Sequence, residues 1–285
     1  MSPKPSISCE FFPPKTDKGF ANLTAVRKQL RAINPKYYSV TFGAGGTTQD
    51  YTLEAIRNIQ SESTQTGIEA APHISCVGTT RQSITDLIAT YQSLGITRLV
   101  ALRGDQPSGM QTAGDFRYAN ELVEFIRQTT GDHFTIEVAA YPEQHPQSNS
   151  AQTDLENFKR KVDAGADSAI TQYFYNIDAY RYFLDRCQQN NIDIPITPGI
   201  MPINNFIQLA RFSDNCGAEI PRWLRKRLAE FHDDTASLQA FTLDFLTDFT
   251  QNLIGLGVPG LHFYTMNKTD PILTICQRLG LSVKK

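Results

Sequence analysis

The sequence predicts a single α/β domain, a (β/α)8 barrel of the TIM type, from three observations. The chain has 285 residues, and one barrel of about 250 residues accounts for nearly all of it. Short runs rich in β-branched and aromatic residues recur along the chain, with amphipathic segments between them, as expected for βαβ units around a parallel sheet. No linker or low-complexity tract divides the chain, so we expect one domain over 1–285. An open doubly wound sheet is the alternative.

The strands and helices follow from local patterns. The predicted strands are, in chain order, Ile7–Phe12, Tyr37–Phe42, Ala70–Cys76, Arg98–Arg103, Thr135–Tyr141, Ser168–Phe174, Ile194–Met201 and Leu261–Met266. Between the third and fourth, Gln82–Leu94 carries apolar residues at helical spacing, which is typical of a helix in the outer layer. About sixty residues separate the last two strands, and they contain the helical segments Pro221–Phe231 and Thr235–Ile254. We therefore expect an extra helical segment between strands seven and eight.

Composition limits the class of function. The chain has 27 basic and 29 acidic residues, a balance that favours neither nucleic acid nor an anionic membrane surface as a partner. The first residues lack the apolar core of a signal peptide, and no stretch approaches the roughly 20 apolar residues of a membrane span. Five cysteines lie far apart without a C-x-x-C pair, as expected for free thiols. These features predict a soluble, cytoplasmic protein.

Polar residues gather at the ends of the predicted strands, where barrel enzymes build their active sites. They are Thr41, His73, Arg103, Asp105, Tyr141, His145, Gln172, Tyr264 and Lys268. On one rim, such a set indicates a site for a large polar ligand. The histidines have none of the spacings of a metal site, so we expect no catalytic metal.

Glu10 interrupts the apolar first strand between Cys9 and Phe11. A carboxylate inside a barrel is costly to ionise, so desolvation is expected to raise its pKa and prepare it as a general acid near neutral pH. The alternative is a buried glutamate paired with an internal arginine or lysine.

Three further features have two interpretations each. Asp105 could form a plain salt bridge with Arg103, two residues before it. The segment Gly43–Thr48 resembles a phosphate loop but is also consistent with a tight turn. The basic run Lys159–Lys161 lies on a predicted helix, where it could be a solvated face or could contact a pyrophosphate.

Nine segments in order resemble the bacterial methylenetetrahydrofolate reductase family. They are Cys9–Lys15 (CEFFPPK), Ser39–Gly43 (SVTFG), Ala70–His73 (AAPH), Ala101–Asp105 (ALRGD), Ala139–Pro146 (AAYPEQHP), Lys159–Ala166 (KRKVDAGA), Ile170–Phe174 (ITQYF), Pro198–Pro202 (PGIMP) and His262–Thr265 (HFYT). The resemblance spans nearly the whole chain. It implies the barrel, noncovalent FAD, and a ping-pong transfer of hydride from NADH or NADPH to 5,10-methylenetetrahydrofolate, giving 5-methyltetrahydrofolate.

The resemblance also implies roles for individual residues. Glu10 would be the acid that helps open the imidazolidine ring, Asp105 would lie near flavin and pterin and stabilise the cationic iminium, and Gln172 would hydrogen-bond the folate. The residues that match FAD-binding positions are Thr41, His73, Arg103, Asp105, Tyr141, His145, Asp154, Arg160 and Lys161. The residues assigned to the substrate are Gln172, Phe212, Tyr264 and Lys268.

For Phe212 and Lys268, the chemistry of the side chain limits the role that it can have. Phe212 would be a stacking platform for nicotinamide and folate. Lys268 stands where relatives carry an arginine for the folate glutamate tail, and a lysine keeps the charge but loses the bidentate fork.

Two other functions fit parts of the pattern. One is a folate-binding barrel methyltransferase, which would need no flavin, and the other is a catalytically silent flavin- or folate-binding protein. The resemblance further implies a homo-oligomer whose partners are small-molecule substrates, without the regulatory domain that eukaryotic members of the family carry. The choice between NADH and NADPH stays open because no Rossmann acidic residue or matching arginine can be read in this fold.

Overall fold

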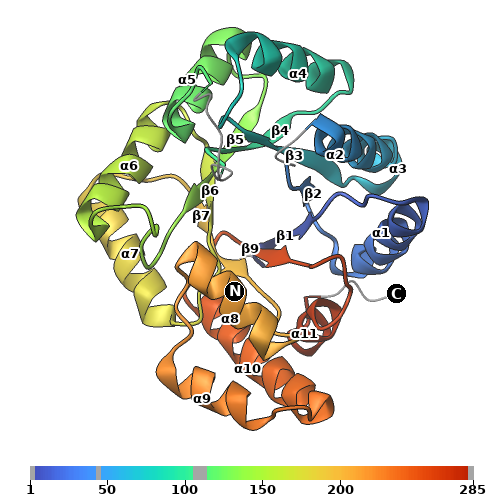
Figure 1. The fold of residues 1–285 in the computed structure, drawn as a ribbon, viewed down its shortest axis with the longest axis vertical. Helices are drawn as coiled ribbons and strands as arrows, with labels where there is room; N and C mark the ends of the chain where they lie inside the picture. The colour runs from blue at the N-terminus through green and yellow to red at the C-terminus, as the bar shows by residue number, and fades with distance from the viewer. Residues whose placement is uncertain (1–3, 43–45, 105–113, 282–285) are drawn as a thin grey trace.

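The chain folds into a parallel β-barrel surrounded by helices (Figure 1), as the sequence predicts. A computed structural model describes residues 4–42, 46–104 and 114–281. The strands are β1 (Ser6–Phe11), β2 (Tyr37–Val40), β3 (Glu69–Ser75), β4 (Arg98–Leu102), β5 (Thr135–Ala140), β6 (Ser168–Thr171), β7 (Ile196–Thr197), β8 (Gly199–Ile200) and β9 (Gly260–Tyr264). Every pairing is parallel, and the spatial order is β7-β6-β5-β4-β3-β2-β1-β9-β8.

The predicted seventh strand, Ile194–Met201, is shorter and divided in two. Its first part, β7, pairs with β6, and its second part, β8, pairs with β9. Pro198 lies between them and has no backbone N–H to contribute to a ladder, but its carbonyl accepts a hydrogen bond from the His262 N–H at 3.0 Å. The chain changes partner at this proline, and that change closes the ring.

The helices lie outside the ring. They are α1 (Asp17–Leu30), α2 (Gly46–Gln60), α3 (Ser63–Thr66), α4 (Arg81–Ser93), α5 (Ala119–Thr130), α6 (Ala151–Asp163), α7 (Ile177–Gln189), α8 (Phe206–Cys216), α9 (Arg222–Glu230), α10 (Thr235–Gly255) and α11 (Ile272–Arg278), with a 3-10 turn at Arg31–Ile33. Several begin at a side chain that accepts a backbone N–H of the first turn, as Thr16 does for α1 and Ser150 for α6. None of the helices in the described ranges combines the length and hydrophobicity needed to cross a membrane.

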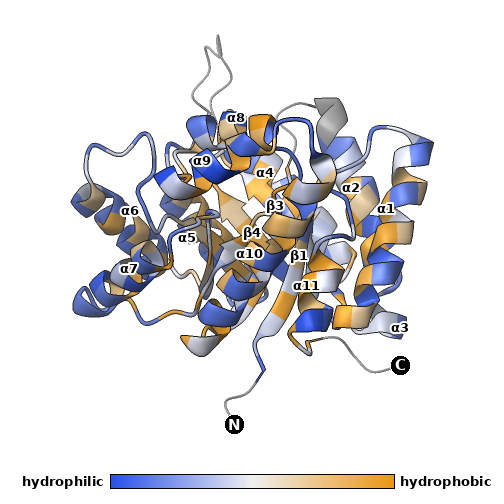
Figure 2. Ribbon diagram, turned by 90° about the horizontal axis from the view of Figure 1, so that it is seen from below, coloured by the Kyte–Doolittle hydropathy of each residue, from blue (hydrophilic) through white to orange (hydrophobic). Residues whose placement is uncertain are grey.

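The extra helical segment before the last strand is confirmed. The long helix α10 contacts α7 and α11, so it occupies the place of the crossover helix in the outer layer. Helices α8 and α9 are therefore additional, and α8 lies at the end of the barrel opposite the N-terminus (Figure 2). This is the end where the strands finish and where an active site is expected.

Side chains alternate between two environments along the strands. In β1, Ile7, Cys9 and Phe11 belong to the apolar core between strands and helices. Ser8 and Glu10 point the other way, because Ser8 bonds a side chain of β9 and Glu10 lines the central cavity. The interior of this barrel is thus unusually polar, and its polar side chains form the candidate site.

Candidate active site

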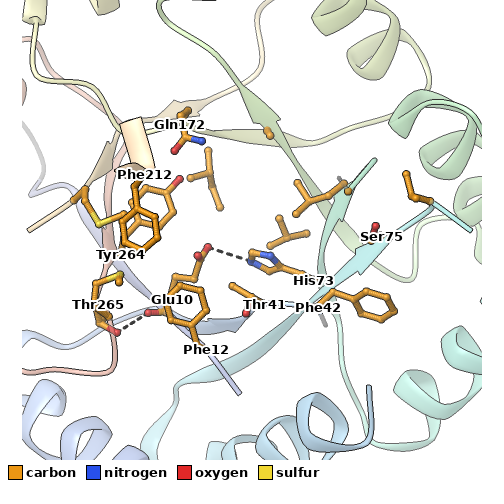
Figure 3. A pocket seen from close by; sticks show the side chains of 18 of the residues that line it. Glu10, Phe12, Thr41, Phe42, His73, Ser75, Gln172, Phe212, Tyr264 and Thr265 are labelled. Carbon is orange, nitrogen blue, oxygen red and sulfur yellow. Dashed lines mark hydrogen bonds and ion pairs between the residues drawn. The ribbon is translucent and has the colours of Figure 1, made fainter. Parts of the chain in front are cut away.

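A cavity of about 700 Å³ opens at the C-terminal ends of the strands. Figure 3 shows Glu10 between His73 on one side and Phe212 and Tyr264 on the other. The predicted site residues that line it are Glu10, Thr41, His73, Tyr141, Gln172, Phe212 and Tyr264. The structure thus brings together residues from six different strands or strand ends and from helix α8.

Glu10 is held by two histidines. Its Oε2 lies 3.3 Å from His73 Nε2 and 3.5 Å from His262 Nε2, and its side chain is 13% exposed. Burial alone would raise its pKa, but the positive charge and hydrogen bonding of the two imidazoles outweigh burial and lower the pKa of Glu10 to about 2. The expectation of a raised pKa was therefore wrong, and so was the alternative of an arginine or lysine partner, because the partners of this carboxylate are histidines.

The loop after β9 fixes the backbone around Glu10. The Thr265 hydroxyl donates to the Glu10 carbonyl at 2.6 Å. The Asn267 side chain makes two bonds to Phe12: it accepts from the Phe12 N–H and donates to the Phe12 carbonyl, both at 2.9 Å. Because these contacts join segments about 250 residues apart, Glu10 is held by the closure of the barrel as well as by its own strand.

A second cavity of about 290 Å³ adjoins the first, and the two share Gly104, Leu102, Ala139 and Tyr141. The predicted FAD-binding residues that line it are Arg103, Tyr141, His145, Asp154 and Lys161. The Asp154 carboxylate accepts from the backbone N–H of His145 at 2.9 Å. The Tyr141 and His145 rings meet edge-on, with centroids 4.6 Å apart. Two cations, Arg103 and Lys161, therefore face a pocket whose wall is fixed by its own contacts.

The basic run on α6 does not act as one patch. Lys161 is partly buried and donates to the Ala139 carbonyl, and burial lowers its pKa to about 8. Lys159 pairs with Asp163 at 2.9 Å on the outer face. Arg160 is exposed and donates to Asn157, which itself lines the second cavity. Lys161 lies in the cavity wall, Arg160 is at its edge, and Lys159 is on a solvated face.

Gln172 and Tyr264 differ in what they can offer a ligand. The Gln172 Oε1 accepts from the Tyr173 N–H at 3.0 Å, which orients the amide group. The Tyr264 hydroxyl donates to the Thr171 carbonyl at 2.8 Å, and burial raises its pKa well above the ordinary value. The phenol hydrogen is already engaged, so Tyr264 can contact a ligand mainly through its ring.

Phe212 and Lys268 lie near the mouth of the cavity. Helix α8 is attached to the segment after β6 through Ser213, whose hydroxyl is 3.1 Å from the Tyr173 hydroxyl. This leaves Phe212 37% exposed above the cavity. A small adjacent hollow of about 110 Å³ is lined by both Phe212 and the exposed Lys268. An aromatic surface and a cation therefore lie on the same side of the opening.

Some predictions fall outside the described residues. Asp105 is one of them, so neither its place near a flavin nor its pairing with Arg103 is addressed, and the same holds for Gly43–Gly45 of the glycine-rich segment. Among the residues that are described, no group of three or more His, Cys, Asp or Glu side chains is arranged to hold a metal ion.

Sequence reasoning did not assign His262, although it recognised the motif around it. The ring is fully buried, with Nε2 facing Glu10 and Nδ1 2.7 Å from the Ser8 hydroxyl. The available signal was alternation: His262 precedes Tyr264 by two residues in β9, so both point into the barrel. Its contact with Glu10 joins β9 to β1 and could not be read from either strand alone.

The family model described as methylenetetrahydrofolate reductase matches residues 2–280. The chain belongs to this family. It is 39% identical over 276 residues to the 5,10-methylenetetrahydrofolate reductase of Escherichia coli K12, covering 97% of this chain and 91% of that protein. It is also 39% identical to a rice protein named as a probable NADH-dependent methylenetetrahydrofolate reductase, of which it covers 48%.

A solved structure supports the fold of this family member. An uncharacterized protein from Clostridium thermocellum, described as binding two copies of 5-methyl-5,6,7,8-tetrahydrofolic acid, superimposes with a TM-score of 0.64. The alignment covers 97% of this chain and 94% of that one at 15% identity. At this identity the likeness concerns the fold alone.

Proposed function

We propose that this reductase-family member converts 5,10-methylenetetrahydrofolate to 5-methyltetrahydrofolate, with noncovalent FAD as cofactor and NADH or NADPH as the hydride source. The observation that carries the proposal is the main cavity, where Glu10 lies with Gln172 and Phe212. Its volume of about 700 Å³ is in the range of pockets that enclose ligands of this size. Membership of the family supports the proposed reaction, and the cavity could hold its substrates.

The residues present fit a flavin dinucleotide. His73 Nε2 is buried and has no hydrogen-bond partner of good geometry among the described residues, although the Glu10 carboxylate is near. In the second cavity, Arg103 and Lys161 present the charges that a pyrophosphate needs. The residues that would hold FAD are Thr41, His73, Arg103, Tyr141, His145, Asp154, Arg160 and Lys161. When bound, FAD supplies two-electron chemistry, taking hydride from the nicotinamide and passing it to the folate-bound carbon.

The side chains of the protein deliver the proton and position the two substrates. Glu10 is a carboxylate at rest because its pKa is lowered, so it must take up a proton before it can deliver one to a nitrogen of the imidazolidine ring. The protonated ring then opens to the reactive iminium. Gln172 orients the pterin through its amide, and Phe212 provides a stacking surface for nicotinamide and folate in turn. Lys268 attracts the carboxylates of the glutamate tail. One cavity serves both substrates, so the nicotinamide leaves before the folate enters.

The decisive experiment follows the visible absorbance of the purified protein under anaerobic conditions. We expect bleaching on addition of NADH or NADPH and recovery of the oxidised spectrum on addition of methylenetetrahydrofolate. Bleaching without recovery would remove folate as the acceptor. A protein that binds no flavin even when FAD is supplied would instead favour a folate-binding methyltransferase or a silent binding protein.

The variant Glu10→Gln tests whether Glu10 is the acid that protonates the folate. Glu10→Gln keeps the shape of the side chain but cannot donate a proton, so we expect bleaching by the nicotinamide to persist and recovery with folate to fail. Glu156→Gln, on the exposed face of α6, is the matched control and should behave as the parent. Normal recovery in Glu10→Gln would show that another group is the acid.

A cytoplasmic location and a homo-oligomeric state stay predictions.

A further inference from the structure

Glu143 is a partly buried carboxylate in the loop between β5 and α6, two residues after Tyr141. Its Oε2 accepts a hydrogen bond from the backbone N–H of Glu219 at 2.7 Å. Its Oε1 is buried and has no hydrogen-bond partner among the described residues. Burying a carboxylate oxygen without a partner costs free energy, so Glu143 calls for a physical explanation.

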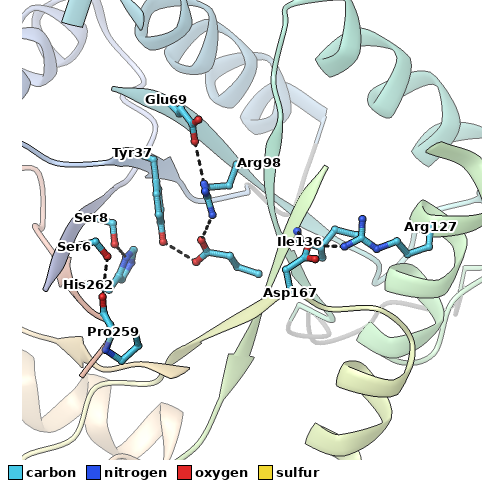
Figure 4. Close-up of polar contacts among 11 residues, drawn as sticks. Ser6, Ser8, Tyr37, Glu69, Arg98, Arg127, Ile136, Asp167, Pro259 and His262 are labelled. Carbon is cyan, nitrogen blue, oxygen red and sulfur yellow. Dashed lines mark hydrogen bonds and ion pairs between the residues drawn. The ribbon is translucent and has the colours of Figure 1, made fainter. Parts of the chain in front are cut away.

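The buried carboxylate at the other end of the barrel is fully partnered. Glu137 has both oxygens engaged, one by Arg98 at 2.7 Å and the other by the Tyr37 hydroxyl at 2.6 Å. Figure 4 shows Arg98 beside Tyr37, and the guanidinium carbon lies 4.8 Å from the centre of the Tyr37 ring. Glu137 is therefore accounted for as part of the framework, whereas Glu143 is only half accounted for.

The N–H that Glu143 binds belongs to the segment Gly217–Ile220, which follows α8 directly. Gly217 packs on the same loop as Glu143 holds, because a Cβ added to this glycine would lie 3.1 Å from Pro146 Cδ. The loop after β5 thus contacts the end of α8 at two points, Glu143 and Pro146.

Helix α8 is also attached from the side of β6. The hydroxyls of Tyr173 and Ser213 are 3.1 Å apart, and Cys216 Sγ lies 3.4 Å from the Tyr173 hydroxyl. A hollow of about 10 Å³ is lined by Glu143 together with Gln172, Tyr173 and Cys216. Because Gln172 also lines the main cavity, Glu143 lies behind the wall of the candidate site.

These contacts matter because α8 carries Phe212. The side chain is 37% exposed and lines the main cavity as well as two hollows that adjoin it. A ring that stands this far into the opening is placed by its helix more than by packing around it. The contacts that fix the end of α8 therefore fix the ring.

We propose that Glu143 is a positioning residue for Phe212: by holding the backbone that follows α8, it sets where the Phe212 ring lies over the main cavity. The inference rests on the proposed function where it takes Phe212 as the surface for nicotinamide and folate. Glu143 is not among the described residues that line the main cavity, so it acts through the helix. Its loop also carries Tyr141 and His145, and the anchor thus joins the flavin side of the site to the substrate side.

The charge of Glu143 determines how firmly the segment is held. Burial raises the pKa of Glu143 from 4.5 to about 7, and the Glu219 carboxylate adds to this effect, although the bond from the Glu219 N–H acts in the opposite direction. The docked segment therefore favours the protonated carboxyl. Docking is strongest below pH 4.5 and weakens as the pH rises through 7. The equilibrium constant for release should rise about tenfold from pH 6 to pH 8.

Other ionisable groups also face Glu143. They are Glu219 in the segment after α8, Cys216 on α8, Tyr173 after β6 and Tyr141 on its own loop. Burial raises the pKa of Tyr173 well above its ordinary value, so this phenol stays neutral at pH 6 to 8. A comparison of the parent with Glu143→Gln isolates the carboxyl from the remaining groups, because they are the same in both proteins.

The direct test is hydrogen exchange of the Glu219 amide, followed by NMR in the purified flavoprotein. Exchange requires this N–H to leave Glu143, so its protection reports release of the segment. In the parent we expect the protection factor, which corrects for the intrinsic effect of pH, to fall about tenfold from pH 6 to pH 8. In Glu143→Gln, which keeps an oxygen to accept the bond but cannot ionise, it should stay constant.

The amide of Leu256, which donates to the Asn252 carbonyl at the end of α10, is the internal control and should respond in neither protein. Protection of the Glu219 amide that is equal in the parent, Glu143→Gln and Glu143→Ala at every pH would overturn the proposal. This measurement does not depend on turnover or on a bound substrate.

Ligand binding shows whether the anchor positions Phe212. Glu143→Ala should raise the Kd of 5-methyltetrahydrofolate for the oxidised flavoprotein by about two- to tenfold, as expected when one aromatic contact is misplaced. Phe212→Ala should have an effect of similar size, and the double variant should exceed the larger single effect by less than about twofold. Effects that multiply in the double variant would show that Glu143 does not act through Phe212, and would overturn the proposal.

Two further variants separate anchoring from general support of the fold. Glu143→Ala should still fold, because Ala218 and Ile220 of the released segment remain buried in the core. Glu143→Gln should bind folate with the parental Kd, because it keeps the acceptor. Glu219→Ala removes an exposed side chain but keeps the bonded N–H, so it should also behave as the parent. Failure of Glu143→Gln to restore binding would refute the anchor.

The outcomes distinguish this inference from the proposed function. A parent flavoprotein that binds no folate refutes the proposed function, and hydrogen exchange still decides whether Glu143 holds the segment. A parent that completes both half-reactions, together with multiplying effects of Glu143→Ala and Phe212→Ala, refutes the inference alone.

Discussion

Replacing Lys161 with methionine should stabilise the folded protein at neutral pH while weakening its hold on FAD. Burial lowers the pKa of Lys161 from 10.5 to about 8. Keeping the charge in the folded state at pH 7 therefore costs up to about 3 kcal/mol, at 1.36 kcal/mol for each pKa unit. Methionine keeps the length of the stem without the charge, but loses the bond to the Ala139 carbonyl, worth about 1 kcal/mol. The expected net gain is about 2 kcal/mol, and less to the extent that solvent reaches the partly buried amine.

The sign of the pH dependence follows from the same shift. The folded pKa lies below the unfolded one, so the cost of the charged lysine is fully present below pH 8 and is relieved as the pH rises to about 10.5. The stability advantage of Lys161→Met should therefore be largest at neutral pH and should disappear in alkali. Urea unfolding of the flavin-free protein across this pH range measures it directly.

Lys159→Met is the matched control, because Lys159 lies two residues earlier and is 39% exposed in its pair with Asp163. It should change stability little and with no such pH dependence, since exposed ion pairs contribute little. FAD retention, measured by ultrafiltration, should fall in Lys161→Met and not in Lys159→Met. A Lys161→Met variant that is less stable at pH 7, or parallel to Lys159→Met at every pH, would refute the reasoning.

Substitutions at three other positions, Gly199, Asn267 and Lys268, test the framework of the site. Gly199→Ala should destabilise the folded protein by about 2–3 kcal/mol in thermal unfolding, because the added Cβ would lie 2.3 Å from the Thr171 carbonyl oxygen. The control Gly255→Ala places its Cβ where nothing lies within 4 Å, so it should be neutral or stabilising. Equal effects of the two substitutions would contradict the close packing between β6 and β8. Asn267→Ala should cost about 1–2 kcal/mol by removing two bonds to backbone, and an unchanged midpoint in urea would show that this lock is dispensable. Lys268→Ala should weaken polyglutamated folate more than monoglutamated folate in binding titrations, and Lys268→Arg should tighten it; equal loss for both substrates would remove the tail contact.

The sequence by itself determined the number and order of most elements. Periodicity placed α4 at Gln82–Leu94, one residue from its observed start and end, and it placed α10 equally well, because the spacing of apolar residues is a local property. Pro198 lies in the middle of the single strand predicted at Ile194–Met201, and the sequence did not predict that the strand divides there, because the division depends on which strands lie on either side. The ordered motifs predicted the family and, with the rule for barrel rims, most of the residues that now share one cavity.

The tertiary structure decided the electrostatics of the site. Burial of Glu10 was readable from its apolar strand, but its partners were not: His73 lies 63 residues away and His262 lies 252 residues away in the chain. Both approach Glu10 only because the barrel closes, and together they reverse the expected shift of its pKa. The division of the basic run into Lys161 inside and Lys159 outside has the same origin, since it depends on which face of α6 packs on the barrel. Pairwise electrostatic effects depend on distances in space, and local sequence patterns do not contain those distances.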